Sequence, residues 1–600
     1  MSPRKSGQNV EVEEDSNDKM TSIDELFKKP NLPAGSTKRK YEPPGAQQAY
    51  KAAKLSSNGS PNGLHSNGAT VENAEDDDVE AGPELPPNDE GDDEEGRFFG
   101  GGVTQDTAEA LDYIDQQDED GYKEERIDST WLRRLAVSFG RKVNKNAELR
   151  ARYEGQPEKF MASEADLDAE VKSWSLLSEH PELYKQFAES ESAGLLVGLL
   201  AHENTDIAIG AIEIISELLD EDVEAGQEQW DVLVAALLDA DLLELLMSNL
   251  ARLDEDNESD RSGVYHSLAV MEGLASQQSV AEKVGQEKIL MWLCNRIRKP
   301  EKTLGQNKQY AAEVLQVLLQ SSSLLRKRLA VDIDGVDLFL RLLAAYRKRD
   351  PPKDSPEEEY AENVFDALTC VVDESEGKSK FVEAEGVELC LIMLKEGTFS
   401  KIRALRLLDH AIAGPGSIAA EVCEKLVDAG GLKTIFSTFM KKADNTTVEH
   451  ILSIFSSLLR LLPGESAARI RTLAKFTEKE YAKVTKLVQL RKDYERKVAS
   501  VDEQIKLEQQ MLDNEEREER ADEFYSRRLD GGLFCLQTVD VVLSWLVAED
   551  PGAKDHLDTQ VGGLAPVKAS LQEQLNGLDH KAAEDEDTRD MLSTLISFLD

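Results

Sequence analysis

Long apolar runs are missing from this sequence. The most apolar stretch, Leu533–Val547, is short and contains Gln537 and Asp540, whereas a membrane-spanning helix needs about 20 mainly apolar residues. The opening residues, MSPRKSGQ, are not followed by an apolar segment, so we expect no signal peptide. We therefore expect no membrane among the partners.

Cysteine is also scarce, and the five cysteines form no CxxC pair. They are Cys294, Cys370, Cys390, Cys423 and Cys535. Widely spaced cysteines on apolar helical faces are typical of reduced core thiols in a cytosolic or nuclear protein.

The residue patterns that carry catalysis or bind metals are absent. The sequence has no HExxH and no GxSxG, and its eight histidines are scattered, which gives no support to a zinc site or a nucleophile elbow. Three glycines at 100–102 are not followed by Gly-Lys-Ser/Thr, as a phosphate-binding loop requires. We expect no enzyme, no catalytic residue, no metal and no cofactor.

Positive charge is in deficit. The 117 acidic residues outnumber 70 Lys and Arg, which gives a formal net charge of −47. This balance disfavours direct nucleic-acid binding, which depends on basic surface, and it favours basic protein partners. The 600 residues exceed what one compact core holds, so several domains or a repeat array are expected.

Residues 1–127 are predicted to be a disordered, acidic head, because a segment rich in Ser, Asn, Gly, Pro and acidic groups buries too little apolar area to fold. Between Glu72 and Glu95 there are thirteen acidic residues and no basic one. This block is either a solvated tail or an autoinhibitory segment that competes for a basic ligand. The cluster Lys38, Arg39 and Lys40 resembles a nuclear localisation signal and predicts the nucleus.

From about residue 128 the chain shows apolar residues at helical spacing, and a small or turn residue before an apolar helix recurs. The steps between these residues are 47, 44, 50, 51 and 45, close to the period of HEAT and armadillo arrays. The Asn204–Asp206 turn and the opening glycines favour the armadillo form. The predicted fold is an all-α armadillo-repeat superhelix, an α-solenoid. The recurring residues are Gly194, Asp241, Gly285, Gly335, Gly386 and Gly431.

We expect N-terminal capping helices over 128–188, armadillo repeats over 189–462 and a C-terminal helical region over 463–600. In the last region a heptad-like apolar stripe runs from Leu487 to Leu512. Packing of this stripe onto the last repeats as a cap is favoured over a coiled coil between chains, and a homodimer is left open.

In armadillo proteins the long third helix of each repeat lines a concave groove, and in nuclear-import carriers this helix holds a Trp-x-x-x-Asn ladder. Alignment to the first turn places Glu213 and Glu217 at the two ladder positions of the first repeat. It places Glu313 and Val317 there in the third repeat, and Asp366 and Cys370 in the fourth. The ladder is therefore absent. Carboxylates at its positions predict a groove for basic, Lys/Arg-rich peptides.

Several long motifs resemble the beta-catenin-like protein 1 family of nuclear armadillo proteins. They are SFGRKVNKNAELRARYEGQPEKFMASEADLD (Ser138–Asp168), HENTD (His202–Asp206), NLARLDED (Asn249–Asp256), LRLLDHAIAGP (Leu405–Pro415) and DEFYSRRLDGGLFCLQ (Asp522–Gln537). The resemblance implies a non-catalytic subunit of the spliceosome-associated nineteen complex in pre-mRNA splicing. It also implies recognition of nuclear localisation signals of splicing factors.

Three other functions stay open at this point. An import adaptor of the importin-alpha type would need a basic head and the Trp/Asn ladder. An adhesion or signalling adaptor like beta-catenin would need a basic groove, which the four carboxylates oppose. A coiled-coil oligomeric scaffold would use the C-terminal stripe instead of the groove.

Overall fold

The computed structural model describes residues 126–600 apart from 415, 562, 579–585 and 600. The disordered-head prediction, with Glu72–Glu95 and the signal-like Lys38, Arg39 and Lys40, lies almost wholly outside these residues. Two compact units are distinguished, one of residues 1–37 and 136–600 and one of residues 38–135. Every described element is a helix, which confirms the all-α class.

Only residues 126–135 of the second unit are described, and they contain the beginning of α4 (Ser129–Arg152). The Asp128 carboxylate accepts hydrogen bonds from the backbone N–H groups of Thr130 and Trp131, at 2.8 and 3.0 Å. These bonds satisfy two of the free N–H groups at the helix start.

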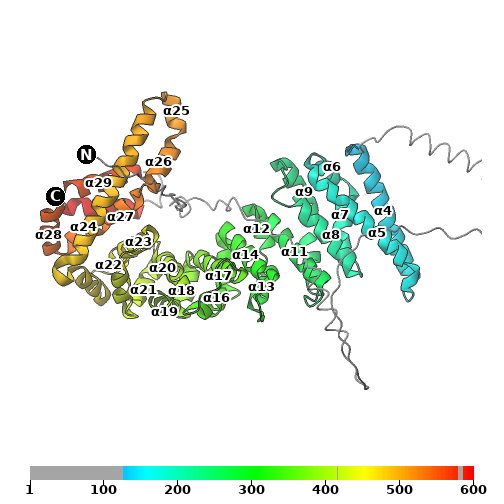
Figure 1. Cartoon of the computed structure of the whole chain (residues 1–600), viewed down its shortest axis with the longest axis horizontal. Helices are drawn as coiled ribbons and strands as arrows, with labels where there is room; N and C mark the ends of the chain where they lie inside the picture. Colours follow the sequence, from blue (N-terminus) through cyan, green and yellow to red (C-terminus); the bar gives the residue numbers. More distant parts are fainter. Residues whose placement is uncertain (1–125, 415, 562, 579–585, 600) are drawn as a thin grey trace, which may run out of the picture. The chain divides into compact units, whose positions relative to one another are not determined.

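The first unit consists largely of a repeated three-helix motif, in which two short helices precede a long one (Figure 1). The first short helices are α9 (Gln227–Asp239), α12 (Gln278–Val284), α15 (Ser323–Val331), α18 (Ser375–Glu383) and α21 (Ser417–Asp428). The second are α10 (Leu242–Leu250), α13 (Glu287–Arg298), α16 (Gly335–Leu343), α19 (Gly386–Glu396) and α22 (Gly431–Met440). The long helices are α8 (Thr205–Leu218), α11 (Glu258–Ala275), α14 (Gln306–Ser321), α17 (Pro356–Val372), α20 (Phe399–Ile412) and α23 (Asn445–Leu461).

Shorter elements precede α8 and connect some of the helices. They are η1 (Pro157–Lys159), α5 (Met161–Lys172), η2 (Ser173–Glu179), η3 (Pro181–Leu183), α6 (Tyr184–Glu189), α7 (Glu191–Gly198), η4 (Leu199–Ala201) and η5 (Ala344–Tyr346).

The corner between the two short helices explains the periodic glycines. A Cβ on Gly335 would lie 2.6 Å from a Leu329 side-chain carbon, and one on Gly386 would lie 2.3 Å from the Phe381 ring. The glycine therefore permits the second helix to start against the end of the first. Gly194 differs, because it lies inside α7 with open space at its Cβ position.

The long helices pack one against the next in chain order, from α8 to α23. Asn204 caps α8 by accepting a hydrogen bond from the Asp206 N–H at 3.0 Å. Ten of the fourteen residues of α8 are buried, and beyond its first turn only Glu213 and Glu217 stay outside the core. A helix that is apolar nearly all round is stable only between neighbours, which is the packing that a stacked array supplies.

The C-terminal region is built around α27 (Leu533–Glu549), which packs against α23 and α24 (Ala467–Gln509). The predicted apolar stripe of α24 is buried within the chain at Leu487, Tyr494 and Val498, so this packing accounts for the stripe without a second copy. The remaining helices are α25 (Asn514–Glu519), α26 (Ala521–Asp530), α28 (Pro551–Val561), α29 (Ala565–Gly577) and α30 (Glu586–Phe598).

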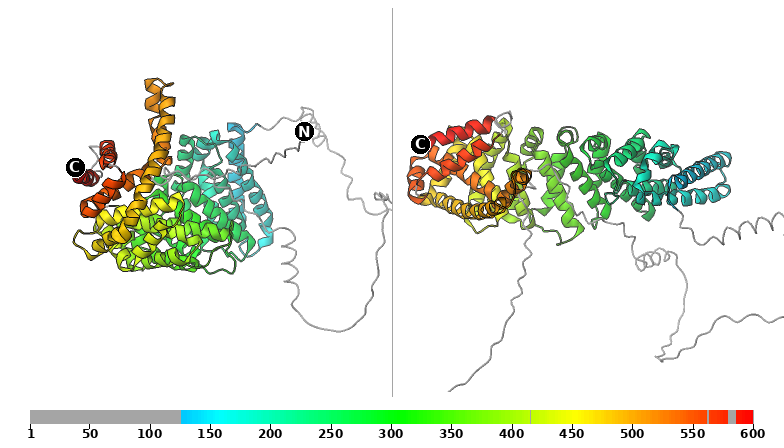
Figure 2. Two further views of the ribbon diagram at one scale, coloured as in Figure 1. Left: turned by 60° about the vertical axis from the view of Figure 1, so that its left-hand side comes forward. Right: turned by 90° about the horizontal axis from the view of Figure 1, so that it is seen from above.

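The distal half of α24, with α25 and α26, stands out from the helices around it (Figures 1 and 2). Within the described residues, no single helix has both the length and the apolar character to cross a membrane, although the bent pair α26–α27 passes that test by length and composition. The predicted divisions at 188/189 and 462/463 remain predictions.

Candidate peptide-binding site on the long helices

On each long helix the residues left partly exposed fall at spacings of three or four, which is one face of a helix. We call the line that they form from helix to helix the long-helix stripe. All four predicted site residues belong to it. Its members are Glu213 and Glu217 on α8, His266, Ala269 and Gly273 on α11, Tyr310, Glu313 and Gln316 on α14, Glu362, Asp366 and Cys370 on α17, Arg403, Arg406 and His410 on α20, and Ser453 and Ser457 on α23.

The alignment made from the sequence reproduces this stripe with one offset. It placed Val317 at the second position of α14, but Val317 is 8% exposed and belongs to the core. Gln316 takes that position instead.

The α8 part of the stripe holds two half-buried carboxylates one helical turn apart. Burial raises the pKa of Glu213, and the charge of Lys172 opposes this rise. Burial also raises the pKa of Glu217, and the charge of Glu213 adds to the rise. Among the described residues no Lys or Arg lies within ion-pair distance of either carboxylate, since Lys172 pairs with Asp168 at 2.7 Å. Their desolvation cost is relieved only in part, by the charge of Lys172 at Glu213 and by a hydrogen bond from Ser175 at Glu217.

His266 on α11 is the basic group nearest to this pair. Its Nε2 lies 3.9 Å from Glu213 Oε1, and its Nδ1 lies 3.1 Å from the Ser216 hydroxyl. Burial lowers the pKa of His266 to about 4, so the ring is neutral near pH 7. A neutral ring leaves the charge of Glu213 uncompensated.

Between α11 and α14 a tyrosine contributes to the stripe. The Tyr310 hydroxyl donates to Glu272 Oε2 at 2.5 Å, and its ring lies 5.1 Å from that of Tyr265. Glu313 lies one turn further along α14 on the same face. The stripe of α8, α11 and α14 thus contains carboxylates and no Lys or Arg.

The α17 and α20 part of the stripe is different, because its carboxylates already have cationic partners. Asp366 accepts a hydrogen bond from Arg406 at 2.9 Å, and Glu362 pairs with Arg403. Burial raises the pKa of Asp366, and Arg406 opposes this rise. Near the C-terminal ends of the same two helices, His410 lies 2.9 Å from Asp373.

Sequence reasoning missed these pairs, although a signal for them exists. Glu362 and Arg403 are 41 positions apart, and Asp366 and Arg406 are 40 apart. Both separations are close to one repeat, so opposite charges recurring at the repeat period indicate contact between neighbouring long helices.

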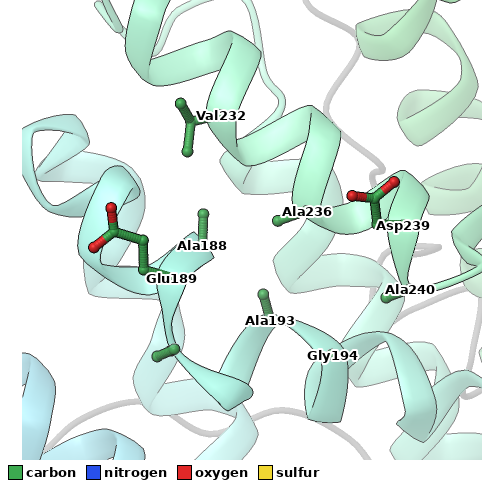
Figure 3. A pocket seen from close by; sticks show the side chains of 9 residues that line it. Ala188, Glu189, Ala193, Gly194, Val232, Ala236, Asp239 and Ala240 are labelled. Atoms are coloured by element: carbon green, nitrogen blue, oxygen red, sulfur yellow. The ribbon is translucent and has the colours of Figure 1, made fainter.

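Two further carboxylates, Glu189 and Asp239, line a shallow depression in the same part of the chain (Figure 3). Small side chains such as Ala193 and Ala236 form its floor, and the two acidic groups lie on opposite sides of it. Neither carboxylate stands on a long helix. They therefore provide a matched comparison for Glu213 and Glu217.

Three-helix repeats stacked through their long helices define an armadillo-type α-solenoid, a repeat scaffold for protein partners. Residues 108–575 match the family described as "Catenin-beta-like, Arm-motif containing nuclear". The chain belongs to this family, because the match covers more than half of it.

Two relatives agree with this assignment. The beta-catenin-like protein 1 homolog of Schizosaccharomyces pombe is 37% identical over 461 residues, which cover 76% of this chain and 80% of the relative. Beta-catenin-like protein 1 of Homo sapiens is 36% identical over 436 residues, covering 70% and 76%. An engineered protein of known structure is 15% identical, with a match that covers 76% of this chain and 98% of that protein at a TM-score of 0.44.

Proposed function

We propose that this chain is a non-catalytic nuclear scaffold of pre-mRNA splicing, associated with the nineteen complex. In this proposal it takes basic segments of splicing factors, of the nuclear-localisation type, on the long-helix stripe. Glu213 and Glu217 would bind the Lys and Arg side chains, with Glu313 extending the site along the stripe.

One observation carries the binding proposal. Glu213 and Glu217 are half-buried on neighbouring turns of α8, and no Lys or Arg among the described residues forms an ion pair with them. A lysine or arginine of a ligand would offset the cost of holding these carboxylates ionised there. The same cation gains less from a fully hydrated surface carboxylate, where ion pairs contribute roughly 0–1 kcal/mol.

The experiment is a titration of the full chain against a fluorescent Lys/Arg-rich nuclear-signal peptide, followed by anisotropy at low and at moderate salt. The variant is Glu213→Lys/Glu217→Lys, and the control is Glu189→Lys/Asp239→Lys. Both variants change the net charge by the same amount. A difference between them therefore reports the position of the charges and not their sum.

We expect salt to weaken the binding of the wild type, because screening acts on exposed and half-exposed charges. The α8 variant should lose about tenfold or more in affinity, because both carboxylates are half-exposed and each of the two lost pairs contributes roughly 1 kcal/mol. The control should bind like the wild type. Binding that survives the α8 reversal would move the site off the stripe, and loss in the control alone would move it to the depression of Figure 3.

The splicing role has a separate basis, namely membership of a family described as nuclear and the resemblance stated from the sequence. Its test is purification of the tagged chain from its own cells, with mass spectrometry for nineteen-complex subunits. Absence of those subunits, together with unchanged intron retention after depletion, would contradict it.

A further inference from the structure

The carboxylates on the α8 part of the long-helix stripe differ from those on the α17 part in whether an arginine pairs with them. On α8, Glu213 and Glu217 have no Lys or Arg partner among the described residues. On α17, Glu362 and Asp366 each have an arginine from α20. The stripe carboxylates on α17 therefore already have cationic partners from the chain itself, whereas those on α8 do not.

The arginines of α20 are held in place by more than their carboxylates. The Arg403 guanidinium lies 3.8 Å from the centre of the Phe399 ring and donates to the Phe399 carbonyl at 2.8 Å. Phe399 packs near Tyr346 and Phe365, with ring centres 6.2 and 6.4 Å away. Stacking and a fixed backbone acceptor hold Arg403 in its paired position, so little side-chain freedom is left for it to swing away.

Arg406 is attached in a similar but simpler way. Its Nη1 donates to Asp366 at 2.9 Å, and both side chains are about two-fifths exposed. This charge-assisted hydrogen bond is the kind that a ligand arginine would also make with Asp366.

We propose that Arg403 and Arg406 are internal occupants of the subsites that α17 would otherwise offer to a basic ligand. The stripe then takes one short basic cluster, on α8 to α14, and excludes a second cluster at α17. This inference rests on the proposed function, because it concerns the specificity of the same surface. Arg403 and Arg406 then determine specificity, because they block the access of a basic ligand to Glu362 and Asp366.

The size of a suitable probe follows from helix packing. Packed helices lie about 8–10 Å apart, so the three steps from α8 to α17 span roughly 27 Å. An extended peptide covers about 3.3 Å per residue, and a spacer of about eight residues reaches from one subsite to the other. The two probes are a peptide with one Lys-Lys-Arg-Lys cluster and a peptide with two such clusters joined by an eight-residue Gly/Ser spacer.

The experiment measures the affinity of both peptides for the full chain. The wild type should bind them with equal affinity, within about twofold, because only the α8 carboxylates lack an arginine partner among the described residues. In Arg403→Gln/Arg406→Gln the two-cluster peptide should gain about tenfold over the one-cluster peptide, the factor that about 1.4 kcal/mol supplies. Arg403→Lys/Arg406→Lys keeps both charges and should behave like the wild type.

A second variant tests the inference without replacing the arginines. Glu362→Gln/Asp366→Asn removes the α17 carboxylates and leaves two unpaired arginines, which should weaken both peptides alike, so the ratio of the two affinities should stay unchanged. Circular dichroism and the thermal unfolding midpoint show whether each variant is folded. If the glutamine variant does not fold, this carboxylate variant decides the question.

The outcomes separate this inference from the proposed function. A wild type that prefers the two-cluster peptide, or a change in the ratio of the two affinities on removing Glu362 and Asp366, would overturn it. So would a folded glutamine variant without any gain. If neither peptide binds the wild type, the proposed function fails. If neither peptide binds the wild type but one of them binds Arg403→Gln/Arg406→Gln, the blocking role is still supported. If neither binds that variant, the blocking role is refuted.

Discussion

Replacing Lys378 by methionine should loosen the ends of two long helices at once. Lys378 on α18 is 4% exposed, and its ammonium donates at 2.7 Å to the carbonyl of Val372 and at 2.7 Å to the carbonyl of His410. These carbonyls lie in the last turns of α17 and α20, where a helix has no internal donors left. One side chain therefore caps both helices that carry the ion pairs of the stripe.

The expected loss follows from the groups that the substitution leaves behind. Methionine keeps the volume and most of the apolar stem of lysine, so the packing changes little. The buried Val372 carbonyl loses its donor, at a cost of about 1–3 kcal/mol, whereas the His410 carbonyl still accepts from the backbone N–H of Ala413 at 3.3 Å. Part of this cost is offset because a buried ammonium no longer has to be desolvated. We expect a net loss of about 1–2 kcal/mol near pH 7.

The pH dependence gives a sharper test. Burial lowers the pKa of Lys378 to about 8, and the charges of Asp373, Glu374, Cys423 and Asp409 oppose this shift. Between pH 8 and about 10.5 the unfolded chain binds more protons at this lysine than the folded chain does, so its contribution to stability rises with pH. The neutral amine still has two N–H groups for the two carbonyls. The stability difference between wild type and methionine variant should therefore grow from pH 7.5 to pH 9.5.

Urea unfolding followed by circular dichroism at these two pH values measures the difference, and hydrogen exchange locates it in α17 and α20. The control is Lys380→Met, two residues further on, where the lysine is 39% exposed and pairs with Glu383. That variant should change little, since exposed pairs contribute roughly 0–1 kcal/mol. The reasoning is refuted if Lys378→Met costs no more than the control, or if its cost shrinks as the pH rises.

Two further predictions concern a close backbone contact and a buried ion pair elsewhere in the chain. Gly377→Ala should destabilise the chain by about 3 kcal/mol, because the new Cβ would lie 1.9 Å from the Val371 carbonyl oxygen and the backbone would have to move. Thermal unfolding measures this loss. The control is Gly194→Ala, where the space around the new Cβ is open. Arg491→Leu should cost about 3–5 kcal/mol, because it strands the buried Asp540 carboxylate. Burial raises the pKa of Asp540 to about 6, so this cost should shrink as the pH falls from 7.5 to 5; an unchanged cost would contradict the prediction.

Much of the repeat fold could be predicted from the sequence because its causes are local. Helix periodicity and the turn at Asn204 depend on residues a few positions apart. The glycine spacing reflects a corner that each repeat builds in the same way, as at Gly335 and Gly386. Gly194 was placed in the same series, but its position inside α7 has no such corner. A sequence period identifies repeats more reliably than it identifies the role of one member.

Whether each stripe carboxylate has a cationic partner could not be predicted from local sequence patterns. Whether Asp366 is open depends on Arg406 of the next repeat, and that contact is set by the stagger between α17 and α20. The inserts that make the repeat steps unequal shift this stagger by whole residues, and one residue turns a helical side chain by about 100°. The same sensitivity put Val317 in the place of Gln316.

The stripe is also the part of the array that is free to determine partner choice. On α8, ten of fourteen residues are buried, and changing them costs packing before it affects a ligand. Glu213 and Glu217 can change with little effect on the core, whereas replacing Asp366 leaves Arg406 without its partner. In the proposed function, a carboxylate that pairs with a neighbouring repeat has a structural role, and one without such a pair binds the ligand. The net charge of −47 then predicts the sign of the partner's charge, and the pairing between adjacent long helices predicts where on the array that partner binds.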